Sequence, residues 1–459
     1  MKKQTGDMKI QCGEGRRPRR QGATGGPRGR GPSRHIMVIA ASCLAAWAPS
    51  AGLADGGERA SPAPAPTTDL TLDDAVRLAL QHHPVLRAGA WRVEAAEGRA
   101  KQMRLWPNPE LEFSAEEMPT DGGGFGASLN QAGISQTVPF PGKSLLDGRI
   151  GRLAVRESEA DLGAVRAEVE RDAKVAFFRA LGAEGLMSDA RELANLVGQA
   201  AGVARERARA GAIPEQEMLR AEIASEQALA ELSGHEAERL AARQALATAI
   251  GRPDLSTARL AGALRETADL SILAGGRASA VAAHPSVAAA EAARERAAAE
   301  VRRAQVEPMP DVTLGLSAGR DEAAGAGIMG FRVSVPLPLI DRAQGKAREA
   351  RAEAAIAESE LAAAQLRLAR DWATAEARLR SAAAQAAAYR ERILPRARQA
   401  AELVKAGYEG GKLGFIDWLD TQRTLAETRI AYQQKLFELN AAQAEIEALL
   451  ASPRAATKP

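Results

Sequence analysis

The chain has 459 residues, of which 46% are hydrophobic but only 3% aromatic, and its formal net charge is +3. Ten Lys/Arg and two Asp/Glu lie in the first 54 residues, so the remaining residues carry 3 − 8 = −5. This balance excludes a nucleic-acid-binding protein, whose affinity depends on basic side chains. Both cysteines, Cys12 and Cys43, lie in the same segment, so a disulfide framework, a thiolate metal site and a cysteine nucleophile are excluded from the rest of the chain.

The first 54 residues are typical of a signal peptide. Three arginines between residues 28 and 34 precede an apolar run over residues 36–48, and small residues continue up to Ala54. We expect cleavage after Ala54, with lipidation of Cys43 as the alternative. The basic region is long enough that the true start of translation could lie further downstream. A Pro/Ala-rich linker covers residues 55–68.

The spacing of apolar residues and the positions of prolines predict the elements of the rest of the chain. Apolar residues recur in steps of three and four where we expect helices, and they alternate with polar residues where we expect strands. No stretch of 18 apolar residues lies after the signal peptide, so a transmembrane helix is not expected. In chain order the pattern predicts a short helix at 72–81, a helix at 84–106 and a hairpin at about 110–138. A helix at 144–210 follows, which would be roughly 100 Å long, and then a shorter helix that reaches about residue 250.

The second half of the chain repeats this order. His284-Pro285 lies 201 residues after His83-Pro84, and a second Pro-x-Pro again precedes a predicted hairpin, at about 311–337. Another long helix comes next and is interrupted at Pro395. We therefore predict two tandem structural repeats, at 69–265 and 266–452, and a C-terminal tail at 453–459.

The number of strands predicts an oligomer. Two hairpins give four strands per chain, which are too few to close a barrel, whereas three chains supply twelve. The strands alternate, with Leu314 and Leu316 between Thr313 and Gly315, as expected of a membrane barrel with an apolar outside and a polar inside. The fold class predicted is thus mainly α with a small β part.

Four phrases of the sequence resemble a known family. They are 72–76 with His83-Pro84, the Pro-Asn-Pro-Glu-Leu of 107–111, the Val-Pro-Phe-Pro-Gly-Lys of 138–143, and the run from Tyr408 through Gly410-Gly411 to Asp420. In these phrases the chain is similar to the TolC-like outer-membrane efflux proteins. The second and third phrases are most similar to the heavy-metal efflux branch.

The resemblance implies a function as well as a fold. It implies a homotrimer with a 12-stranded β-barrel in outer-membrane lipid and a large periplasmic α-helical barrel. Such proteins are exit ducts of tripartite efflux systems or of type I secretion. Here we expect the duct of a tripartite efflux system, which passively conducts solutes, heavy-metal cations among the candidates, to the exterior. Its partners are a periplasmic adaptor (membrane fusion) protein and an inner-membrane RND-type transporter. The exported substrate itself, whether metal, drug or solvent, is not specified by the sequence.

The resemblance also assigns roles to residues near the second helix turn. In the family, acidic residues at the periplasmic tip line a constriction and gate it, and Asp417 and Asp420 match them here. Glu217 holds the corresponding place after the first turn, and Tyr408 matches an aromatic residue that holds the tip closed. Leu413 departs from the pattern, because well-known members carry an arginine there. The alternative interpretation is that the acids favour helix N-termini and that Tyr408 packs between helices.

No pattern in the sequence indicates an enzyme. Residues 325–330 satisfy G-x-G-x-x-G, but the residues after them alternate like a strand, whereas a dinucleotide site needs a helix there. The five histidines lack the spacing of zinc ligands, and His83 and His284 are expected at helix boundaries. We expect no cofactor and no metal site. The competing interpretation is an exported structural coiled-coil protein without channel activity, which alanine-rich helices alone would permit.

Overall fold

The computed structural model describes residues 69–117, 125, 128–322, 324–410 and 412–450. The predicted signal peptide, the linker and the C-terminal tail at 453–459 lie outside the described residues, and the bounds of the two repeats stay a prediction. In the part that is described, no helix combines the length and the apolar character needed to cross a membrane.

The first half contains four helices and two strands. They are α1 (Leu72–His82), α2 (Pro84–Gln102), β1 (Glu110–Glu116), β2 (Leu129–Val138), α3 (Pro141–Arg209) and α4 (Glu215–Ile250). The long helix α3 begins at Pro141, three residues earlier than predicted, because proline is well suited to the first turn of a helix. The helix α2 ends at Gln102, four residues before Trp106, and the chain leaves it through turns in which the Arg104 and Leu105 N–H groups donate to the Lys101 and Gln102 carbonyls.

The second half has the same order after two short 3₁₀ segments. Its elements are α5 (Gly276–Ala283), α6 (Pro285–Gln305), β3 (Val312–Asp321), β4 (Ala326–Ser334), α7 (Gln344–Ala388), α8 (Leu394–Glu409) and α9 (Phe415–Leu449). The interruption predicted at Pro395 is a π-helical segment, Tyr389–Ile393, between α7 and α8. Proline lacks an N–H and crowds the preceding turn, so the hydrogen bonds there are displaced by one residue.

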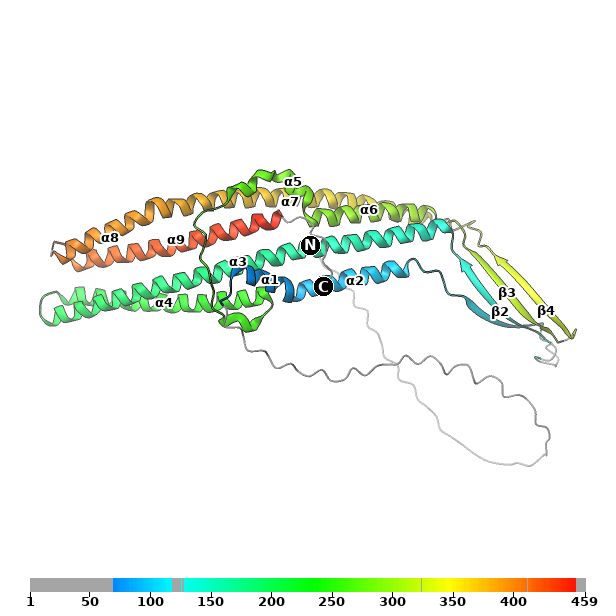
Figure 1. The fold of residues 1–459 in the computed structure, drawn as a ribbon, viewed down its shortest axis with the longest axis horizontal. Helices are drawn as coiled ribbons and strands as arrows, with labels where there is room; N and C mark the ends of the chain where they lie inside the picture. Colours follow the sequence, from blue (N-terminus) through cyan, green and yellow to red (C-terminus); the bar gives the residue numbers. More distant parts are fainter. Residues whose placement is uncertain (1–68, 118–124, 126–127, 323, 411, 451–459) are drawn as a thin grey trace, which may run out of the picture. The chain divides into compact units, whose positions relative to one another are not determined.

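The helices lie side by side in the order that the repeat predicts (Figure 1). Both α2 and α4 pack along α3, while α6 packs against α3 and α7, and α9 packs against α3, α7 and α8. Small residues permit close approach: a Cβ placed on Gly151 of α3 would lie 2.9 Å from the Cα of Ala100 in α2. Larger apolar side chains such as Phe177 and Leu379 fill the remaining space between helices.

The four strands form one antiparallel sheet in the order β1-β2-β3-β4. The sequence predicted the two hairpins, and the structure adds the pairing of β2 with β3, in which Ile134 lies opposite Leu316. The register places apolar side chains in rows on one face, for example Leu111, Ile134, Leu316 and Phe331. Every member of this row is more than half exposed. This largely apolar face, which also carries Gln136, Asn130 and Arg320, is therefore uncovered along this row in the single chain.

A partly buried ion pair fixes the junction between the sheet and α3. The Lys143 ammonium lies 3.1 Å from a carboxylate oxygen of Asp311, and the Phe140 N–H donates to the same oxygen at 2.8 Å. Lys143 is only 8% exposed, which is rare for lysine unless it is paired. This pair ties the start of α3 to the residue before β3, 168 positions away.

Candidate functional site at the helix turns

The two turns that reverse the helices are built alike. After α3, the Ala212 N–H donates to the Arg207 carbonyl at 2.8 Å, and after α8 the Lys412 N–H donates to the Gly407 carbonyl at 2.8 Å. Each bond spans five residues and satisfies a carbonyl of the last helical turn. The two turns are 200 positions apart and equivalent, and the helices that lead into and out of them share one apolar cluster.

An aromatic cluster lies at the second turn. The rings of Tyr408 and Trp418 stack at a centroid distance of 5.7 Å and an interplanar angle of 21°, and Phe415 lies 6.1 Å from Tyr408 and 5.8 Å from Trp418. The guanidinium of Arg207, at the end of α3, stands 5.6 Å from the centroid of the Tyr408 ring. A cation at this distance is attracted by the ring face. Tyr408 therefore connects the second turn to the first.

The acids of the second turn have different environments. The Asp417 carboxylate accepts a hydrogen bond from the Gly414 N–H at 3.1 Å and so closes the N-terminus of α9. Asp420, one helical turn further, is exposed, and its backbone carbonyl accepts from the Thr424 hydroxyl at 2.9 Å. Asp417 thus caps the helix at whose start it lies, while the carboxylate of Asp420 is presented to solvent.

Glu217 holds the place of Asp417 at the start of α4, but its surroundings differ. The residue at the helix boundary is Pro214, which has no N–H to donate to a carboxylate. Glu217 is half-buried, and its own N–H donates to the Pro214 carbonyl at 3.0 Å. The structure therefore places Asp417 and Asp420 on one helix and Glu217 on the neighbouring hairpin, within the same packed group of helices.

Sequence reasoning missed Arg207. Nothing in its local pattern separates it from the other arginines of α3, because its ring partner lies 201 positions away. The position equivalent to Arg207 is Gly407, where a Cβ would lie 2.7 Å from the Leu413 side chain. Leu413 therefore packs over a glycine, and the cation near Tyr408 comes from the first half of the chain rather than from the second turn.

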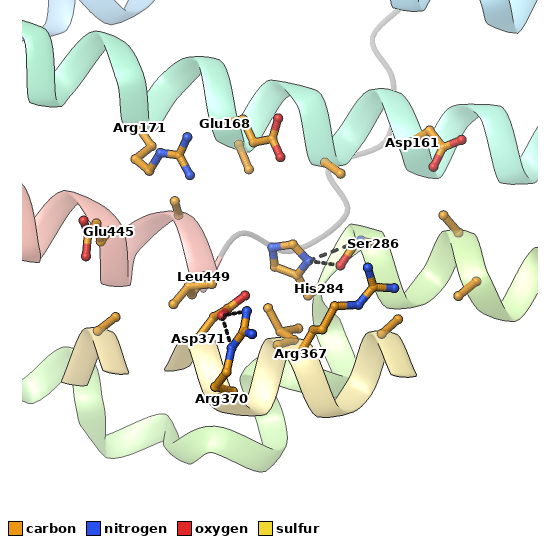
Figure 2. Close-up of a pocket in the computed structure, with 18 of the residues that line it drawn as sticks. Asp161, Glu168, Arg171, His284, Ser286, Arg367, Arg370, Asp371, Glu445 and Leu449 are labelled. Carbon is orange, nitrogen blue, oxygen red and sulfur yellow. Dashed lines mark hydrogen bonds and ion pairs between the residues drawn. The ribbon is translucent and has the colours of Figure 1, made fainter. Parts of the chain in front are cut away.

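A charged cavity of about 920 Å³ lies between α3, α6, α7 and α9 (Figure 2). Asp161, Glu168 and Arg171 line it from α3, and Arg370 pairs with Asp371 on α7 at 2.7 Å. Burial raises the pKa of the Asp161 carboxyl, and the Glu157 carboxylate adds to the rise. In the described residues, no group of three His, Cys, Asp or Glu side chains could hold a metal ion.

His284 also lines this cavity, and its role is structural. Its Nδ1 accepts the Ser286 N–H at 3.2 Å and lies 2.7 Å from the Ser286 hydroxyl, which caps α6. Burial lowers the pKa of the imidazole, which favours the neutral acceptor form. His83 lies at the boundary of α1 and α2. The prediction that both histidines mark helix boundaries is confirmed.

The family model described as outer membrane efflux protein matches residues 75–252 and 277–452. The chain belongs to the outer membrane efflux protein family. The family model matches two segments of similar length, one in each half of the chain.

Known proteins agree with this assignment. The chain is 29% identical over 384 residues to the cobalt-zinc-cadmium resistance protein CzcC of Cupriavidus metallidurans, with 83% of this chain and 90% of that protein covered. Its fold is similar to the open state of the MtrE outer membrane channel of Neisseria gonorrhoeae, with a TM-score of 0.68, 20% identity and coverage of 83% and 89%. It is also similar to the outer membrane protein VceC of Vibrio cholerae, with a TM-score of 0.67, 20% identity and coverage of 83% and 97%.

These findings confirm the resemblance, the mainly helical fold with a small sheet, and the role as an efflux protein of the outer membrane. The family consists of efflux ducts rather than enzymes. The interpretation as a structural coiled-coil protein is set aside, because the family assignment accounts for the sheet as well as for the helices.

Proposed function

We propose that three copies of this outer membrane efflux protein form one continuous duct. The observation that carries the proposal is the four-stranded sheet, whose apolar face is uncovered and whose outer strands β1 and β4 have unpaired edges within the described chain. Such edges promote pairing with further strands, and three sheets give the twelve strands of a closed barrel. The apolar face then contacts lipid and the polar face lines the duct.

We infer that the helix turns form the gate of this duct. With three copies around an axis, Asp420 and Glu217 form rings of carboxylates that attract cations and repel one another. Asp417 adds to the negative charge while it caps α9. The stack of Arg207, Tyr408 and Trp418 holds the two turns of each copy together, so opening requires the two hairpins to separate or rotate.

The cargo and partners are inferred from the similarity to CzcC, which is named for resistance to cobalt, zinc and cadmium. We propose that the duct exports divalent heavy-metal cations delivered by an RND-type inner-membrane transporter, through a periplasmic adaptor that docks at the helix turns. A duct with acidic rings suits this cargo, because the rings concentrate cations at the entrance without binding them in a closed site.

Two measurements test the proposal. Purified protein in detergent should have the mass of a trimer by light scattering and should show discrete conductance steps in planar bilayers. Expression together with its pump and adaptor should restore cobalt, zinc or cadmium tolerance to a host that lacks an outer-membrane duct. A monomer without conductance would contradict the duct, whereas conductance without metal tolerance would contradict only the proposed cargo.

A further inference from the structure

Two charged side chains meet across the whole width of the sheet. The Arg332 guanidinium of β4 lies 3.7 Å from a carboxylate oxygen of Glu112 in β1, although β2 and β3 lie between these strands. Neighbouring strands are about 4.8 Å apart, so a flat sheet would separate the two backbones by roughly 14 Å. Long Arg and Glu side chains span part of this separation, and a sheet that curves toward the face carrying both of them brings the two charges together.

The register explains how the contact is possible. The row that ends at Arg332 reads Glu110, Ser135, Gly315 and Arg332, and the next row on the same face reads Glu112, Gly133, Ser317 and Gly330. Small residues occupy the middle of both rows, so nothing bulky stands between the two charges. Glycines on the inner side of a sheet also permit close backbone approach and sharp curvature. From the contact and these small residues we infer that the polar face is concave.

The charges on this concave face are unbalanced. Alternation along β1 places Glu110, Glu112 and Glu116 there, and Asp321 joins them from β3. Among the described strand residues, Arg332 is the one cation in register with this face. Arg320 lies in the opposite register, in the row of Ala115 and Gly327.

We propose that Arg332 sets the charge selectivity of the strand-lined part of the duct, by neutralising Glu112 and limiting the negative charge that permeating ions meet. The proposal rests on the trimeric duct inferred above, which turns the concave face toward the conducted solution. The pair of Arg332 and Glu112 is then a selectivity element in the strands, separate from the acids at the helix turns. Without Arg332, each copy exposes one more uncompensated carboxylate, and three copies expose three.

Reversal potentials in planar bilayers under a KCl gradient test the proposal. The variant Arg332→Gln should raise the ratio of cation to anion permeability about twofold or more at roughly 0.1 M salt, where a charge about 10 Å from the ion still acts within a Debye length. Glu112→Gln should lower the ratio, and the double variant should return close to the wild-type value. Arg320→Gln is the matched control, because it removes the same charge from the other face and should leave the ratio unchanged.

The outcomes separate this inference from the proposed function. If the wild-type protein forms no channel, the duct itself is contradicted and the inference fails with it. If the channel conducts but Arg332→Gln shifts the ratio no more than Arg320→Gln, the role of Arg332 is wrong while the duct stands. A double variant that keeps the shift of Arg332→Gln would also overturn the pairing with Glu112. Trimer mass by light scattering, measured for each variant, shows whether assembly is preserved.

Discussion

The carboxylate of Asp417 accepts a hydrogen bond from the Gly414 N–H at 3.1 Å, whereas the equivalent Glu217 comes after Pro214, which has no N–H. Two acids at equivalent positions of a repeat therefore differ in what they stabilise. The carboxylate of Asp417 is hydrogen-bonded to the boundary residue of its helix, whereas the carboxylate of Glu217 has no such bond to its boundary residue. This difference predicts different responses to the same kind of substitution.

Replacing Asp417 with Ala should destabilise the start of α9 by about 1 kcal/mol, since a capping carboxylate is lost. Hydrogen exchange should become faster at the backbone amides of residues 414–418. Glu217→Ala should accelerate exchange at the start of α4 much less, because it loses only the interaction of the carboxylate with the helix N-terminus. Equal exchange in the two variants would show that the bond to Gly414 does not hold the helix end.

Neutralising the ring acids Glu217 and Asp420 should weaken cation block of the channel. The double variant Glu217→Gln with Asp420→Asn removes six charges from a trimer, so divalent cations should be held less strongly at the constriction. We expect the concentration of Co²⁺ that halves the conductance to rise several-fold in planar bilayers. Glu231→Gln, on an exposed position of α4 about four turns from the gate, is the matched control, and an equal effect there would locate the block elsewhere.

The contact between Arg207 and Tyr408 uses the face of the ring. Tyr408→Phe keeps that face and should leave the frequency of channel opening close to wild type. Tyr408→Ala and Arg207→Ala should each increase opening, because a cation–π contact of about 0.5–1 kcal/mol is lost. Arg209→Ala serves as a control, since Arg209 pairs with Glu206 instead. A large effect of Tyr408→Phe would indicate that the hydroxyl, not the ring, holds the turns.

The ion pairs of Glu307 should make the stability of the folded protein depend on pH in the acidic range. Glu307 accepts hydrogen bonds from Lys346 at 2.7 Å and from Arg303 at 2.5 Å, and these partners lower the pKa of its carboxyl from 4.5 to about 2. Because the folded pKa is the lower one, the stabilisation is complete above pH 4.5 and is lost as the pH falls from about 4.5 to about 2.

The side chain of Glu307 is 27% exposed, so solvent screens its ion pairs in part. We therefore expect Glu307 to contribute about 1 kcal/mol to the free energy of unfolding. Thermal unfolding followed by circular dichroism between pH 6 and pH 2.5 should therefore be less dependent on pH in Glu307→Gln than in the wild type. Glu349→Gln, which removes an exposed carboxylate from α7, is the control. The assignment is wrong if both variants keep the wild-type pH dependence.

Two helix glycines should respond oppositely to alanine. A Cβ on Gly151 would lie 2.9 Å from Ala100 backbone, so Gly151→Ala should force α2 away from α3 and destabilise the protein by about 1–3 kcal/mol. Gly98 has no neighbouring atom within 4 Å of such a Cβ, so Gly98→Ala should stabilise α2 by about 0.5–1 kcal/mol. Thermal unfolding of the two variants tests the difference, and similar shifts would contradict the close packing of α2 on α3.

Local patterns in the sequence were sufficient for most helices, strands and turns, and for their repetition. Apolar spacing of three and four residues located α3, alternation located the hairpins, and Pro84, Pro141 and Gly251 lie at helix boundaries. These signals act over a few residues, so they can be recognised without knowing the fold. The same local reasoning placed the end of α2 four residues too late, because the apolar spacing does not distinguish the last helical turn from the i→i+3 turns that follow Gln102.

The pairs that connect the two halves of the chain, at the candidate site and at the sheet, could not be obtained in this way. Arg207 and Tyr408, Lys143 and Asp311, and Glu112 and Arg332 are separated by 201, 168 and 220 positions. Each pair exists because helices or strands from opposite halves pack together, and packing depends on the summed burial of many side chains rather than on any local signal. Periodicity could indicate which residues share one face of an element, but only the folded chain specifies which residue of the other half lies opposite.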